Sequence, residues 1–91
     1  MHPAAMHTVE LLKEAIATAE LLGYRIRYEW LDGVGGGPCK IGGQQIVFVD
    51  LALSPREQFD QVLEALQENP AAARLSLSAP LRQILGLRKS A

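Results

Sequence analysis

The chain has 91 residues, of which 48% are apolar and 21% charged, and its formal net charge is −1. This length accommodates one hydrophobic core, and this composition excludes an intrinsically disordered chain. The single cysteine, Cys39, excludes an internal disulfide and a cysteine-rich zinc site, and no apolar run reaches the roughly 18 residues that a membrane span requires.

The first predicted element is an amphipathic helix from Thr8 to Leu22, because apolar residues recur there with helical spacing. Thr8 is the expected N-cap, and Gly23 can adopt the left-handed conformation that ends a helix. Residues 1–7 contain both histidines and precede the helix. We expect them to form a flexible N-terminus rather than a metal site. They also lack the pattern of a secretory signal, which favours a cytoplasmic location.

The period of the apolar residues changes to two from Tyr24 to Trp30, which predicts a half-buried strand. Three aromatic residues share one face of this strand with Ile26: Tyr24, Tyr28 and Trp30. We interpret this face as core beneath a helix rather than as a platform on which nucleic-acid bases stack. The other face is polar and would be open to solvent or to a partner. It carries the candidate binding residues Arg25, Arg27 and Glu29.

A glycine-rich loop from Asp32 to Gly37 precedes two further predicted strands, Pro38 to Ile41 and Gln44 to Leu51. The Gly42-Gly43 pair between them predicts a β-hairpin, since glycine adopts the positive φ angles of the favoured hairpin turns. We expect the last strand to be central because both of its faces are apolar. The three strands should form an antiparallel sheet with helices packed on one side.

The segment Ser54-Pro55-Arg56-Glu57 is the strongest local signal for the start of a helix. It combines a serine N-cap, a proline at the first helical position and a glutamate three residues after the cap. This helix is expected to end at Asn69-Pro70. Ser78 would then cap a short helix that runs to Leu85 and stops at Gly86. The predicted fold class is therefore α+β, in the order α-β-β-β-α-α.

The charges divide the chain into a domain at residues 8–73 and a cationic C-terminal segment at residues 74–91. All ten acidic residues precede position 74, whereas four of the nine basic residues lie at or after it. Four dispersed positive charges are too few for strong binding to phosphate groups, so nucleic acid is not the partner we expect. We interpret residues 74–91 as a short helix with a frayed, solvated end.

Lys40 follows a run of glycines, which suggests a phosphate-binding loop. Such a loop needs Ser or Thr after the lysine and then a helix, but here Ile41 and a strand follow. Lys40 is therefore kept only as a candidate binding residue. Cys39, beside it, is a candidate nucleophile, although the sequence brings no general base near it. A thiol-dependent enzyme or a redox protein using Cys39 remains one alternative.

Three segments resemble the core of small gluzincin-type metallopeptidases of the ImmA/IrrE kind: 46–50, 53–59 and 63–67. The resemblance implies a scaffold in which a strand and a capped helix lead to a His-Glu-x-x-His motif. Residues 37–43, with the strand and helix that follow, also resemble short bacterial proteins, and that likeness indicates no activity.

The metallopeptidase resemblance places Leu63 and Gln67 at the two histidine positions, and Glu64 at the position of the general base. Leucine cannot ligate zinc. The resemblance therefore implies the scaffold without the metal, and it makes Glu64 the second candidate catalytic residue after Cys39.

The residues assemble no complete catalytic or cofactor-binding constellation. Our leading hypothesis is therefore a small non-catalytic binding or regulatory module without a cofactor, built on a degenerate zincin-like scaffold. Its partner would be another protein or a second copy of the chain, because dimerisation is a common source of stability for a domain this small.

Overall fold

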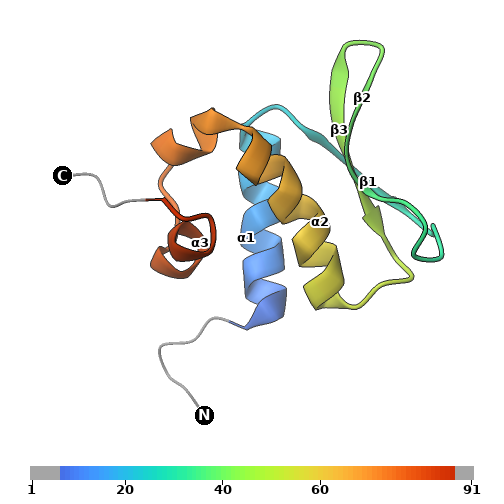
Figure 1. Ribbon diagram of the computed structural model, residues 1–91, viewed down its shortest axis with the longest axis horizontal. Helices are drawn as coiled ribbons and strands as arrows, with labels where there is room; N and C mark the ends of the chain where they lie inside the picture. The colour runs from blue at the N-terminus through green and yellow to red at the C-terminus, as the bar shows by residue number, and fades with distance from the viewer. Residues whose placement is uncertain (1–6, 88–91) are drawn as a thin grey trace.

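The computed structural model describes residues 7–87. Residues 1–6, which include His2, and residues 88–91 lie outside the described part, and with them most of the predicted flexible N-terminus and the predicted frayed end. The described elements are α1 (Thr8–Leu21), β1 (Arg25–Glu29), β2 (Gly37–Ile41), β3 (Gln44–Asp50), α2 (Pro55–Glu68), the 3₁₀ helix η1 (Pro70–Arg74) and α3 (Ala79–Ile84). The predicted α+β class and the predicted order of elements are confirmed (Figure 1).

The three strands form one sheet in the order β1-β3-β2, so β3 is central as predicted. β2 and β3 are antiparallel and joined at Gly42 and Gly43, whose φ angles of 57° and 80° confirm the glycine hairpin. β1 pairs with β3 in parallel, from Arg25 opposite Ile46 to Glu29 opposite Asp50. The sheet is therefore mixed rather than antiparallel throughout. The hairpin causes this, because its returning strand, which runs in the same direction as β1, takes the central place.

The helices lie on one side of the sheet, and the other side faces away from them (Figure 1). On the helix side of β3, Val47 and Val49 are fully buried. They pack in one core with Ala15 of α1 and Phe59 of α2, and Leu81 of α3 belongs to the same core. Burying large apolar side chains at this depth is the main source of stability for so small a domain.

The aromatic residues in β1 and at its two ends do not all enter this core. Tyr24 is buried, and its hydroxyl donates to the carbonyl of Ala65 at 3.5 Å. Tyr28 is 51% exposed and Trp30 is 67% exposed, so the interpretation of this face as core is wrong for both residues. The physical reason is that β1 is an edge strand that ends at Glu29, which leaves Tyr28 at the margin and Trp30 beyond the sheet.

Capping explains where the helices begin. The N-cap of α1 is His7 rather than Thr8, since Thr8 is already helical; the His7 backbone N–H donates to Glu10 Oε1 at 3.1 Å. Ser54 caps α2 as predicted, and its Oγ accepts the Glu57 N–H at 3.3 Å. The N–H and hydroxyl of Ser54 hold the pKa of the Glu57 carboxyl below its usual value.

The described part of the segment 74–91 packs on the domain instead of leaving it. Ser78, the predicted N-cap of α3, accepts the Leu81 N–H at 3.3 Å. Its own N–H and hydroxyl donate to the two carboxylate oxygens of Glu14 on α1, at 2.7 and 2.6 Å. Because Leu81 is fully buried, this carboxylate and an apolar anchor together fix α3 against α1.

Candidate functional site

The side of the sheet that faces away from the helices gathers most of the residues expected to bind a partner. Residues directly opposite each other on paired strands point to the same side of a sheet, and residues along a strand alternate. Side chains that alternate with Val47 and Val49 therefore point away from the helices. We call this side the open face; it consists of Arg25, Arg27, Glu29, Cys39, Ile41, Gln44, Ile46 and Phe48.

Arg27 and Phe48 form the centre of the open face. The Arg27 guanidinium lies 5.7 Å from the centroid of the Phe48 ring, within the range of a cation–π interaction. It also donates to Glu29 Oε2 at 2.9 Å, in an ion pair whose side chains are 52% and 39% exposed. These contacts hold an arginine and an aromatic ring in place at the surface. Arginine and aromatic residues are enriched where proteins contact one another.

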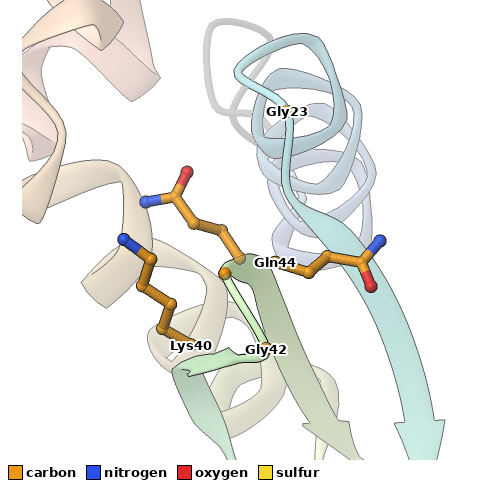
Figure 2. A pocket seen from close by; sticks show the side chains of 6 residues that line it. Gly23, Lys40, Gly42 and Gln44 are labelled. Carbon is orange, nitrogen blue, oxygen red and sulfur yellow. The ribbon is translucent and has the colours of Figure 1, made fainter.

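Lys40 does not join Arg25, Arg27 and Glu29. It lies opposite Gln45 in the ladder, which places its side chain on the helix side of the sheet. There it borders an open pocket of about 620 Å³, together with Gly23, Gly42, Gly43, Gln44 and Gln45. Figure 2 shows this pocket between the tip of the hairpin and the turn after α1. Among the described residues that line it, Lys40 alone is charged, and the others are glycines and glutamines.

The two candidate catalytic residues lie apart. Cys39 is exposed and belongs to the open face, where it lies opposite Ile46. Glu64 is exposed on α2, on the helix side of the sheet, and its Oε1 would lie 3.3 Å from a Cβ placed on Gly37. The structure therefore does not combine the thiol and the carboxylate in one site.

The metal-ligand positions implied by the metallopeptidase resemblance are filled by Leu63, which packs against the core, and by the exposed Gln67. Within residues 7–87, no three His, Cys, Asp or Glu side chains are grouped so that they could hold a metal ion. The described side chains therefore provide no group of ligands that fits zinc.

Asp50 is a buried charged residue that the sequence analysis did not single out. Its carboxylate is fully buried and accepts three backbone N–H groups, from Leu31 at 2.9 Å, Gly33 at 2.6 Å and Ala52 at 2.9 Å. Burial acts to raise the pKa of Asp50, but the three N–H bonds to the charged form outweigh it and lower the pKa. These hydrogen bonds to Asp50 hold the loop after β1 against the end of β3.

Gln61 on α2 holds the same loop from the other side. Its Oε1 accepts the Asp50 N–H at 2.9 Å, and its Nε2 donates to the Gly35 carbonyl at 2.9 Å. Gly36 has a φ of 115°, and a Cβ there would overlap the Gln61 amide. The glycines of this loop therefore serve close packing. An acid at the end of an apolar strand, just before a capped helix, is the signal that could have indicated this network.

No protein-family model, no curated protein and no solved structure matches this chain. None of the described helices is long and apolar enough to cross a membrane. The geometry of the open face is therefore the basis for a functional proposal, and the metallopeptidase resemblance stays a prediction.

Proposed function

We propose that this protein is a small non-catalytic binding module that recognises another protein through the open face. The observation that supports this most directly is the Arg27–Phe48 pair, held at the surface on a side of the sheet that no described helix covers. A sheet face with this composition is suited to contact rather than to chemistry, because it presents a fixed ring and guanidinium without a neighbouring acid–base pair.

The composition of the open face also indicates the chemistry of the partner surface. Ile41 is 51% exposed and supplies apolar area at the hairpin end of this face, opposite Gln44. Arg25 and Arg27 outnumber Glu29, so the face has a positive balance. We therefore propose a partner that presents an apolar side chain flanked by carboxylates, which would engage the ring and the two guanidinium groups together.

The test is a pull-down with the tagged full-length protein at physiological salt, from the cells that express it. Arg27→Ala removes the guanidinium from the open face. Arg56→Ala is the matched control, because Arg56 also forms an exposed ion pair, with Asp60 at 3.5 Å on α2. We expect the wild type and Arg56→Ala to retain a stoichiometric protein partner. Arg27→Ala should weaken the purified complex by roughly 30-fold, the cost of losing a contact hot spot.

Equal retention of the partner by Arg27→Ala and by Phe48→Ala would show that the open face is not the contact surface. The thiol-dependent alternative makes a different prediction, since it depends on Cys39 alone. If Cys39→Ser abolishes the cellular function while Arg27→Ala and Phe48→Ala leave it intact, the protein is an enzyme or redox protein and the binding proposal is wrong.

A further inference from the structure

The outer edge of β1 has unpaired backbone groups. β1 is the terminal strand of the sheet, and the Glu29 carbonyl accepts the Leu51 N–H at 2.8 Å, so the backbone groups of Glu29 point inward to β3. The N–H and C=O groups of successive residues point to opposite edges of a strand. The groups of Ile26 and Tyr28 therefore point outward. Within the described chain, no other strand pairs with them.

The sequence of β1, Arg-Ile-Arg-Tyr-Glu, is complementary to itself when a second copy is placed antiparallel to it and centred on Arg27. In that register Arg25 lies opposite Glu29 of the second copy, and Glu29 opposite its Arg25. On the other side of the strand, Ile26 lies opposite Tyr28. Opposite charges and aliphatic–aromatic pairs are both favourable cross-strand neighbours.

We propose that a second copy of this chain pairs with the edge of β1 in this register, joining the two sheets into one. The partners Ile26 and Tyr28 are the residues whose backbone groups point outward, so each such pair exchanges both backbone hydrogen bonds. Tyr28, which is 51% exposed, gains cover from Ile26 of the second copy. The interface is isologous and closes after two copies.

Charge excludes one of the two alternative registers, and the length of the strand argues against the other. Centring the pair on Ile26 would place Arg25 opposite Arg27, which is repulsive. Centring it on Tyr28 would pair Arg27 with Glu29 but leave Arg25 opposite Leu31, outside the strand. With Arg27 at the centre, the two Arg27 side chains form one like-charge pair, which is set against two opposite-charge pairs between Arg25 and Glu29. Each Arg27 already donates to its own Glu29 Oε2, which leaves Oε1 to accept from Arg25 of the second copy.

The test is a charge exchange followed by sedimentation velocity of the full chain at micromolar concentration. Arg25→Glu places Glu opposite Glu29, and Glu29→Arg places Arg opposite Arg25. Either variant alone should weaken the dimer by roughly tenfold or more, because two attractive pairs become repulsive. An equal mixture of the two variants should form a heterodimer of wild-type affinity, since both opposite-charge pairs return. Arg56→Glu on α2 is the control and should leave the dimer unchanged.

Two further measurements keep the outcome clear. Thermal unfolding establishes that each variant is folded, and the rescue in the mixture shows that both chains are competent. Hydrogen exchange at the Ile26 and Tyr28 amides should slow as the concentration of wild-type protein rises. A wild-type monomer at 100-fold higher concentration, or a mixture that fails to dimerise, overturns the proposed pairing.

This inference rests on the proposed function, because it names a second copy as one protein bound on this side of the molecule. The two can fail separately. A monomer that still captures a partner sensitive to Arg27→Ala removes the β1 pairing and leaves the binding module. If the chain forms a dimer with the predicted rescue and the pull-down from cells yields no other partner, the β1 pairing is supported and the proposed binding of a different protein is wrong.

Discussion

The two faces of β3 differ in what they contact, although their residues alternate along one short strand. Val47 and Val49 are fully buried against the helices, whereas Phe48 between them is half-buried and lies under the Arg27 guanidinium. On one face the side chains exclude water and hold the domain together. On the other, a partly exposed aromatic ring lies under a guanidinium that is held by an ion pair. The helix side of β3 thus supplies core packing, and the open side is the one that we propose for recognition.

Ile46, which is only 5% exposed, and Asp50 are exceptions to this division, and Asp50 is the polar one. Its place in the ladder, opposite Glu29, assigns it to the open face, yet it is fully buried because the loop after β1 crosses over it. There the structure depends on three N–H bonds to one carboxylate instead of on apolar packing. The end of the open face is therefore closed by polar contacts, and the contact surface that we propose lies between this closed end and the hairpin.

The sharpest test of the comparison substitutes one phenylalanine on each side of the sheet. Phe59→Ala leaves a cavity in the core and should lower the free energy of unfolding by about 3–5 kcal/mol. Phe48→Ala loses partial burial and an exposed cation–π contact, which together should cost about 1–2 kcal/mol. Urea denaturation of both variants measures the difference. If the two losses are equal, the open face also carries core packing and the division is wrong.

The second prediction concerns Asp50 and pH. Asp50→Asn keeps the shape but replaces an acceptor-only group by one that donates toward backbone N–H groups. We expect a loss of stability smaller than that of Phe59→Ala and larger than that of Phe48→Ala.

The wild-type pKa gives this prediction its pH dependence. Because the folded pKa of Asp50 is lowered, its stabilisation is complete above the unfolded value of about 3.9 and is lost as pH falls through the folded value. Wild-type urea midpoints should therefore drop below about pH 4, and the Asp50→Asn variant should show a shallower drop. Parallel pH profiles would contradict a charged Asp50 in the folded state.

Local signals predicted much of the fold. The Gly42-Gly43 turn and the Ser54–Glu57 capping box each depend on only a few adjacent residues. The hairpin turn and α2 are therefore found where the sequence predicted them. The central place of β3 also followed from its two apolar faces. Of the candidate binding residues, Arg25, Arg27 and Glu29 lie on one side of the sheet because the period of two places them there.

What the sequence could not indicate depends on segments that are far apart. The parallel pairing of β1 with β3 depends on β1 lying beside the returning strand of the hairpin, a contact between distant segments that no local pattern records. The exposure of Trp30 depends on β1 ending one residue earlier than its alternation suggested. The bonds from Ser78 to Glu14 join residues 64 positions apart, so neither residue alone signals the docking of α3.

The smallest effect on stability is expected at Cys39, and it tests whether the open face is accessible. Iodoacetamide should alkylate Cys39 in the folded protein at a rate within roughly tenfold of that in urea, because the thiol is exposed. The melting temperature should shift by no more than about 2 °C, as for other surface changes.

The matched control for this prediction places the only thiol on the other face of β3, in the double variant Cys39→Ser, Val49→Cys. Val49 is fully buried, so that thiol should react only when the protein opens. Mass spectrometry over time gives both rates. Protection of Cys39 comparable to that at position 49 would mean that the open face is covered in solution, and a partner could not then reach Arg27 and Phe48 as we propose. Rapid labelling at position 39 with slow labelling at position 49 would show that the two faces differ in reactivity as they differ in burial.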